Sequence, residues 1–334
     1  MAGETLVEIR NLTKLYGKFA AVQDLSLQIG SGAIYGFIGP NGAGKTTTMR
    51  ILATLLEPTS GEAWVAGHAI SGDPRPVRAA IGFMPDFFGV YQDMRVWEYL
   101  DFFAASYNVP AARRANMIGD LLTLVGLESK RDNDVEELSR GMKQRLALAR
   151  TLVHDPHLLI LDEPASGLDP RARIELRELL KELRLLGKTI LISSHILTEL
   201  AEVCTHIGII ERGRLLVSGE VDEILRRLRP TRSVLIRVLG RGAQALALVG
   251  HLPGVQGVSW LPAGAAPAPG PGPAPGTPPP DGPLVLRVTI DGDERLLSAL
   301  LTGLVRAEVP VYSFAEEVGN LEDIFMQITR GVVQ

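Results

Sequence analysis

The sequence predicts an α/β fold with a parallel sheet, followed by a smaller α+β domain. Short apolar runs, typical of strands buried on both faces, occur at residues 33–38, 158–162, 189–193 and 207–210. Segments with helical periodicity lie between these runs, at residues 46–56, 142–153 and 171–186. Strands that alternate with helices indicate an α/β core. A change of pattern near residue 229 then marks the second domain.

The second domain is predicted to cover residues 229–334, after a first domain of residues 1–228. Its strands are expected near residues 234–238, 254–261, 284–290 and 309–314, and its helices near residues 242–251 and 294–306. This β-α-β-β-α-β order is typical of a split βαβ, or ferredoxin-like, fold. A last helix is expected over 320–330.

A segment rich in proline, alanine and glycine interrupts the second domain at residues 262–283. Such a composition cannot build a packed core. We therefore expect a mostly disordered spacer between the two middle strands, with a polyproline II ligand as the alternative.

Composition argues against several functional classes. The 334 residues carry a formal net charge of −4, so no basic excess points to nucleic acid as a partner. Cys204 is the single cysteine, which excludes a disulfide within one chain. The first residues do not read as a signal peptide, and no apolar run reaches about 18 residues. The chain is therefore expected not to cross a membrane by itself.

A glycine-rich segment, GPNGAGKTT, follows the first apolar run and opens a helical pattern. It fits G-x-x-x-x-G-K-[ST], the phosphate-binding loop (Walker A), in the strand–loop–helix setting that this motif requires. Backbone N–H groups would face phosphate oxygens, Lys45 would reach the β- and γ-phosphates, and the Thr46 hydroxyl would ligate Mg²⁺. The predicted nucleotide-binding residues of this loop are Gly39, Pro40, Asn41, Gly42, Ala43, Gly44, Lys45, Thr46 and Thr47.

Polar side chains lie at the ends of two other predicted strands and at the start of one helix. The run LLILDEP brings Asp162 and Glu163 to a strand end, where open α/β sheets bind ligands. Asp162 is predicted to hold Mg²⁺, and Glu163 to polarise the water that attacks the γ-phosphate. His195, which ends TILISSH, is either a γ-phosphate sensor or a structural histidine. Ser139 is a natural N-cap before Gly141, so that helix start is either a second anion site or only a capped end.

Residues 6–220 resemble the ATP-binding subunit of ABC transporters. The resemblance rests on the phosphate-binding loop, the signature LSRGMKQ (138–144), ILDEP, the D-loop (166–169) and His195. It implies a Mg²⁺-dependent ATPase with an antiparallel β edge and a helical subdomain over about 86–150. The site residues that it implies are Tyr16 for stacking on adenine; Lys45, Glu163 and His195 for catalysis; and Thr46, Asp86 and Asp162 for Mg²⁺.

The same resemblance implies a pair of ATPase chains. In this family each ATP lies between the phosphate-binding loop of one chain and the signature helix of the other. Ser139 and Gly141 would therefore contact the nucleotide bound by the partner. One such domain per chain implies a homodimer, or a dimer with a related ATPase chain.

Two residues depart from the family pattern. Arg140 stands where the signature usually has its first glycine, and Asp86 stands where a glutamine usually contacts Mg²⁺ and the attacking water. Asp86 can still ligate Mg²⁺ as a hard oxygen donor, but it cannot donate a hydrogen bond while it is ionised. We therefore expect turnover that is slower, or more dependent on a partner, than the family pattern implies.

Half of the aromatic residues (9 Phe, 6 Tyr and 3 Trp in all) fall in the segment 81–107. Three of them have helical spacing and are expected to pack inside the helical insert: Trp97, Phe102 and Phe103. Three others precede that helix and are candidates for contact with a partner: Phe87, Phe88 and Tyr91.

The sequence as a whole favours the motor of an exporter. The chain lacks a membrane span of its own, and residues 313–330 resemble the tails of ATPases that serve drug, lipid or polysaccharide exporters. We expect a cytoplasmic ATPase, peripheral at the inner face of the cell membrane, whose separate integral membrane permease binds near residues 86–107. The alternatives are a soluble ABC-type ATPase that acts on ribosomes or nucleic acid, and a regulator with little turnover.

Overall fold

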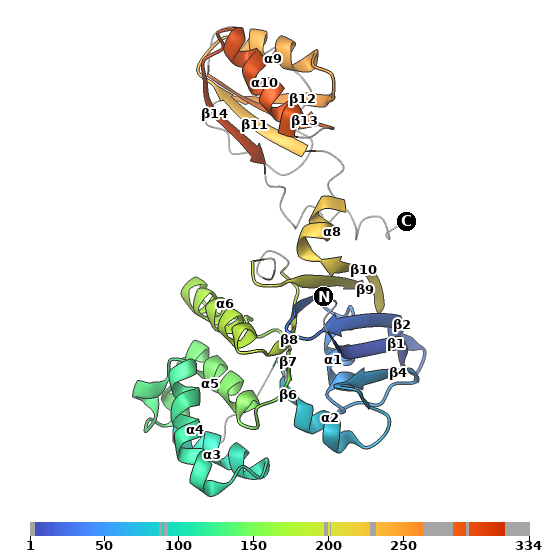
Figure 1. Ribbon diagram of the computed structural model, residues 1–334, viewed down its shortest axis with the longest axis vertical. Helices are drawn as coiled ribbons and strands as arrows, with labels where there is room; N and C mark the ends of the chain where they lie inside the picture. Colours follow the sequence, from blue (N-terminus) through green and yellow to red (C-terminus); the bar gives the residue numbers. More distant parts are fainter. Residues whose placement is uncertain are drawn as a thin grey trace. The chain divides into compact units, whose positions relative to one another are not determined.

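The chain divides into two compact units between Ile224 and Leu225 (Figure 1). The computed structural model describes residues 4–86, 89, 93–196, 200, 202–227, 232–262, 283–291 and 294–317. Most of the proline-rich segment and the helix expected over 320–330 lie outside the described residues, as do Phe87, Phe88 and Tyr91. Each unit is described by itself below.

A six-stranded sheet forms the centre of the first unit, in the order β10-β9-β3-β8-β7-β6. Its strands are β3 (Ile34–Ile38), β6 (Ile81–Met84), β7 (Leu158–Leu161), β8 (Thr189–Ser194), β9 (His206–Glu211) and β10 (Arg214–Glu220). All neighbouring pairs are parallel except β9 and β10. Every residue of β3, β7 and β8 is buried, which explains their unbroken apolar runs. The carboxyl ends of β3, β6, β7 and β8 consequently meet at one edge of the sheet.

An antiparallel sheet lies on one side of this central sheet, and the helical insert lies on the other (Figure 1). The antiparallel strands are β1 (Thr5–Tyr16), β2 (Phe19–Gly30), β4 (Ser60–Val65) and β5 (His68–Ala69). The helix α1 (Lys45–Leu52) shares one buried core with both sheets, through residues such as Ile9, Phe37 and Met49. The expected antiparallel edge is therefore present, and its core supports the start of α1.

Helices provide most of the segment between β6 and β7. They are α3 (Val96–Ser106), α4 (Ala111–Leu124), the 3₁₀ turns η1 (Glu128–Lys130) and η2 (Val135–Glu137), and α5 (Arg140–Leu152). The remaining helices of this unit are α2 (Pro74–Ala80) and α6 (Pro170–Leu185), and α8 (Val221–Arg227) crosses into the second unit. The expected helical insert is present.

The aromatic residues of α3 are only partly buried. Tyr99 is the buried ring, at 1% exposed, whereas Phe102 is 43% exposed. The expectation that Phe102 packs inside was wrong: Phe102 follows Tyr99 by three residues and lies near the same face of α3, but its side chain is left exposed. At the end of α3, Tyr107 stacks on His154, with ring centroids 3.8 Å apart. This stack ties α3 to the segment that follows α5.

The second unit has the β-α-β-β-α-β order that its sequence predicted. Its elements are β11 (Arg232–Val238), α9 (Gly242–Gly250), β12 (Val255–Pro262), β13 (Leu284–Ile290), α10 (Glu294–Arg306) and β14 (Val311–Glu317). The sheet order is β12-β13-β11-β14, and all pairs are antiparallel, as in a ferredoxin-like fold. Alternate residues Val234, Ile236 and Val238 are fully buried in its core.

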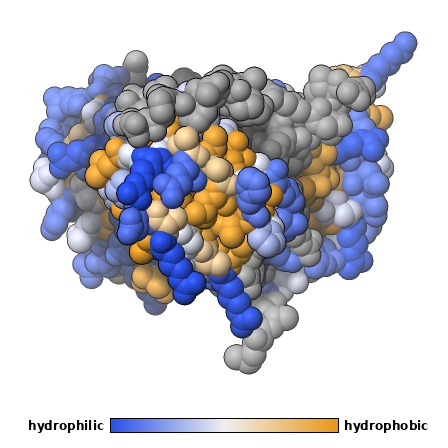
Figure 2. Space-filling view, turned by 90° about the horizontal axis from the view of Figure 1, so that it is seen from above, coloured by the Kyte–Doolittle hydropathy of each residue, from blue (hydrophilic) through white to orange (hydrophobic). Residues whose placement is uncertain are grey.

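Some large apolar side chains of the second unit remain at its surface. They are Leu239, Leu301, Val305 and Tyr312. Figure 2 shows apolar side chains gathered at the surface in the view from above.

Among the residues that the structure describes, we find no helix that is both long and apolar enough to cross a membrane.

Candidate functional site

The glycine-rich loop joins the end of β3 to the first turn of α1. Gly44 is the N-cap of α1 and has φ = 105°, and a Cβ at this position would collide with the carbonyl oxygen of Ala21. The Ala43 carbonyl accepts a hydrogen bond from the N–H of Gly213 at 2.9 Å, which holds the loop against the turn between β9 and β10. Space is open above Gly42, whose φ is 80°. The loop thus leaves room for phosphate groups at a helix N-terminus, and this fits the nucleotide that the motif predicts.

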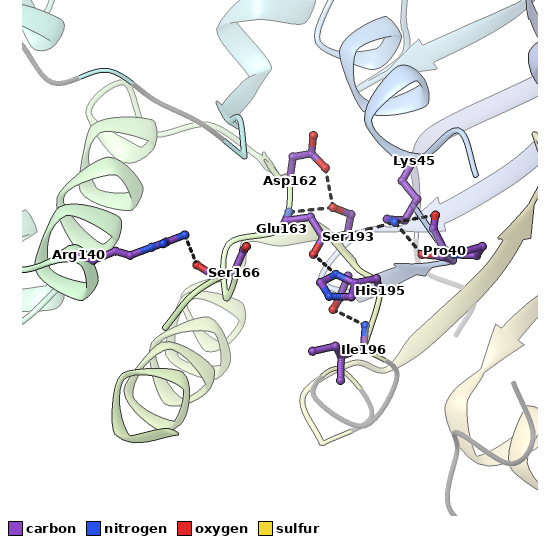
Figure 3. Close-up of polar contacts among 11 residues, drawn as sticks. Pro40, Lys45, Arg140, Asp162, Glu163, Ser166, Ser193, His195 and Ile196 are labelled. Carbon is purple, nitrogen blue, oxygen red and sulfur yellow. Dashed lines mark hydrogen bonds and ion pairs between the residues drawn. The ribbon is translucent and has the colours of Figure 1, made fainter. Parts of the chain in front are cut away.

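Lys45 is buried, and its ammonium group is held inside this loop (Figure 3). Nζ donates hydrogen bonds to the carbonyl oxygens of Gly39 at 2.7 Å and Pro40 at 3.3 Å. It also lies 3.4 Å from Oε1 of Glu163. The structure therefore brings two of the predicted catalytic residues together, although 118 positions separate them in the sequence.

Ser193 links the two acidic residues that follow β7. Its hydroxyl donates to Oδ1 of Asp162 at 2.7 Å and accepts from the backbone N–H of Glu163 at 2.9 Å (Figure 3). Asp162 is 1% exposed, and Ser193 is fully buried. Sequence reasoning missed Ser193, although its position two residues before His195 on a buried strand was an available signal. Its bonds orient the Asp162 carboxylate and fix the backbone of Glu163.

His195 lies directly after β8 and contacts the second oxygen of Glu163. Its Nδ1 is 2.8 Å from Oε2 of Glu163. The other oxygen, Oε1, is buried and makes no hydrogen bond with the described residues. Glu163 also has φ = 50°, a left-handed backbone conformation that costs energy and is typical of functional sites. His195 holds one oxygen of this carboxylate and the Lys45 ammonium group lies 3.4 Å from the other, so the site fixes a carboxylate that can accept a proton from a water molecule.

Asp86 follows β6 at the same edge of the sheet. Partial burial raises the pKa of its carboxyl group, and repulsion from Asp162 and Glu163 adds to this effect. The positive charges of Arg140 and His195 act in the opposite direction. A divalent cation would relieve this repulsion, and carboxylate oxygens are ligands that Mg²⁺ prefers.

Only a few protein side chains would bind Mg²⁺ at this site. Thr46 is the second residue of α1, and Asp86 and Asp162 come from the ends of neighbouring strands. The described residues contain no group of three or more His, Cys, Asp or Glu side chains arranged to hold a metal.

The predicted second anion site lies on α5, apart from the phosphate-binding loop. Ser139 is the N-cap of α5, and its hydroxyl accepts from the N–H of Met142 at 3.3 Å. Figure 3 shows the start of α5 and Lys45 on opposite sides of the loop that follows β7. The structure of one chain therefore does not bring Ser139 or Gly141 to the phosphates that Lys45 would bind.

Tyr16 ends β1 and pairs with Phe19 across the hairpin. The Tyr16 ring is 51% exposed, and Nζ of Lys14 lies 5.5 Å from its centroid. An exposed ring of this kind is available to stack on a base. The role of Tyr16 in binding adenine stays a prediction.

The sequence of this chain is similar to those of known proteins. The sequence profile of the family described as “ABC transporter” matches residues 22–166. The “Nod factor export ATP-binding protein I” of Cupriavidus metallidurans is 40% identical over 220 residues, which make up 66% of this chain and 73% of that protein. The chain belongs to the ABC transporter family. The prediction of an ATP-binding, ATP-hydrolysing ABC subunit is confirmed.

Further ABC proteins agree with this assignment. The “Probable multidrug ABC transporter ATP-binding protein YbhF” of Escherichia coli (strain K12) is 38% identical over 66% of this chain, which corresponds to 38% of that longer protein. The “Structure of ATP binding subunit of ABC transporter” is a solved structure that matches 67% of this chain and 93% of its own chain. Its TM-score is 0.61 and its identity is 30%. The ABC ATPase fold is therefore confirmed.

Proposed function

We propose that this ABC ATPase powers an exporter whose membrane-spanning permease is a separate polypeptide. The network of Lys45, Glu163 and His195 supports the hydrolysis of ATP in this proposal, because it places a cation and a candidate general base at one edge of a parallel sheet. Similar proteins are named for Nod factor export and for multidrug transport, which supports the exporter class. We further propose that the chain is cytoplasmic and peripheral at the inner face of the cell membrane.

Each residue of the site has a proposed role in the hydrolysis of ATP. Residues 39–47 bind the phosphates of ATP, and Tyr16 stacks on the adenine. Glu163 accepts a proton from water at Oε1, while His195 holds Oε2 and senses the γ-phosphate. Thr46, Asp86 and Asp162 would hold Mg²⁺, which when bound neutralises phosphate charge.

The reaction is proposed to need two chains. Ser139 and Gly141 lie at a helix N-terminus, where backbone N–H groups favour an anion, yet they lie away from the phosphate-binding loop of their own chain. Two chains that pair head to tail would place these groups against the nucleotide of the partner. ATP would then link the two chains, and hydrolysis would release them. The partner is a second copy or a related ATPase chain.

The permease is proposed to bind the helical insert near residues 86–107. Phe102 is 43% exposed and Tyr107 is 44% exposed, so this segment presents aromatic surface. We expect affinity capture from detergent-solubilised membranes to recover an integral membrane protein with several apolar spans. Replacing Phe102 by Glu should reduce this recovery several-fold, because it places a charge in the contact.

A control variant makes this capture experiment specific. Leu185 is 88% exposed at the end of α6, outside the insert, so Leu185→Glu should leave recovery of the permease unchanged. Equal recovery with both variants would contradict a contact through the insert. Recovery of ribosomes or nucleic acid in place of a membrane protein would overturn the exporter proposal in favour of a soluble ATPase.

Replacing Asp86 by Gln should raise the basal rate of ATP hydrolysis. The change removes one negative charge beside Asp162 and Glu163, and such a charge costs about 1 kcal/mol in water-like surroundings, or roughly fivefold in rate. Release of inorganic phosphate, measured with and without the partner, tests this expectation. Asp93→Asn, which removes an exposed charge outside the network, is the control. Unchanged rates in both conditions would show that Asp86 does not limit turnover.

A further inference from the structure

Arg140 connects the start of α5 to the loop that follows Glu163. Its Nη2 donates a hydrogen bond to the carbonyl oxygen of Ser166 at 3.0 Å (Figure 3). The guanidinium group also lies against the Cα of Gly167, so closely that a Cβ there would collide with it. One turn later on α5, Gln144 donates to the carbonyl oxygen of Pro164 at 2.6 Å. Two side chains of α5 therefore hold the backbone of this loop.

The loop that Arg140 contacts is the one that shapes the backbone of Glu163. The Ser166 N–H donates to the carbonyl oxygen of Glu163 at 3.0 Å, which closes a tight turn. Glu163 itself adopts φ = 50°. A non-glycine residue persists in this conformation only when the surrounding structure fixes it. Arg140 donates its hydrogen bond to the carbonyl of Ser166, the residue that closes this turn, and this carbonyl is bonded directly to the nitrogen of Gly167.

We propose that Arg140 is a positioning residue, which clamps residues 163–167 to α5 within one chain and so fixes the backbone that carries Glu163. The proposal rests on the proposed role of Glu163 as general base. An arginine suits the contact because its planar group can pack flat on a glycine while it donates a hydrogen bond. A glycine at position 140 would offer neither interaction.

The charge of Arg140 has a second effect at the same place. Arg140 counteracts the rise in the pKa of Asp86 that burial and repulsion cause. The two residues that depart from the family pattern are therefore opposite charges that act on each other. The proposal itself rests on the contacts of Arg140 with Ser166 and Gly167, and losing Arg140 should release the loop.

A simpler interpretation is that Arg140 is a solvated surface charge. Exposed ion pairs and hydrogen bonds often contribute little to stability. Gly167 has φ = 67°, so Gly167→Ala strains the backbone in any background, but only while Arg140 is present does it also push the guanidinium group away. This difference separates the two interpretations. In a chain that already lacks Arg140, the same substitution has no guanidinium group to displace.

The test uses the full-length chain and two readouts. Arg140→Ala should speed amide hydrogen exchange in residues 163–168 about tenfold, with exchange in the neighbouring strands unchanged. It should lower kcat for ATP several-fold and leave unchanged the binding of ATP to a single chain, which uses that chain's own phosphate-binding loop. The control is Arg171→Ala, which removes an exposed arginine on α6 that pairs with Glu175. The control should change neither readout.

The double variant decides between the two interpretations. In the variant that carries both Arg140→Ala and Gly167→Ala, the increase in the hydrogen-exchange rate should be smaller than the sum of the increases in the two single variants. Unchanged exchange in Arg140→Ala, or strictly additive effects, would overturn the clamp. The exchange readout does not depend on turnover. Full activity of Glu163→Gln would instead contradict the proposed function and leave the exchange result to stand by itself.

Discussion

Replacing Glu163 by Gln should reduce ATP turnover by about a thousandfold while ATP binding is retained. The amide keeps the size of the side chain but cannot accept the proton of the attacking water, and loss of a general base typically costs 10²–10⁴-fold, so about 10³ is expected. Oε1, the atom proposed to take that proton, is buried and makes no hydrogen bond with the described residues. Steady-state release of inorganic phosphate measures the loss.

The same variant also tests the proposed pairing of two chains. If ATP links the chains and hydrolysis releases them, Glu163→Gln with ATP and Mg²⁺ should sediment as a dimer, while the wild type returns to a monomer as ATP is consumed. Glu178→Gln, which removes an exposed charge paired with Lys181 on α6, is the matched control and should keep wild-type turnover. A variant that keeps more than about a tenth of the wild-type rate would contradict the role of Glu163. A monomer with bound ATP would contradict the pairing.

Replacing Lys45 by Ala should weaken ATP binding by about 10- to 100-fold. A hydrogen bond to a charged group is worth about 1.5–3 kcal/mol, and Lys45 is the buried cation at the phosphate-binding loop. Its present partners, the carbonyl oxygens of Gly39 and Pro40 and the Glu163 carboxylate, show that the ammonium group already points into the site. Titration with a fluorescent ATP analogue measures the affinity.

Controls for Lys45→Ala must separate binding from folding. The change leaves the partly buried Glu163 carboxylate without its cation, so thermal unfolding has to be measured alongside. Lys181→Ala removes an exposed lysine from α6 and should bind ATP as the wild type does. A folded Lys45→Ala chain with wild-type affinity would show that the loop binds phosphate without this cation.

Patterns that are local in the chain were predicted well. The apolar runs became the buried strands β3, β7 and β8, because a parallel strand covered on both faces is made mostly of apolar residues. The alternating pattern of the second unit became β11 and β13, because one face of each strand is buried against helices. The helical spacing of Phe102 misled, because periodicity locates a helix but does not by itself say which side is covered.

The sequence by itself determined the fold class, the phosphate-binding loop and the order of elements in the second unit. These features depend on neighbouring residues, and a loop such as GPNGAGKTT carries its own conformational requirements within nine positions. Only the tertiary structure decided how Ser193 orients Asp162 across 31 positions and how Arg140 reaches Ser166 across 26. Those contacts depend on β8 lying beside β7 and on α5 packing against the loop after β7. Strand order and helix packing are set by the burial of the whole core, which no local pattern specifies.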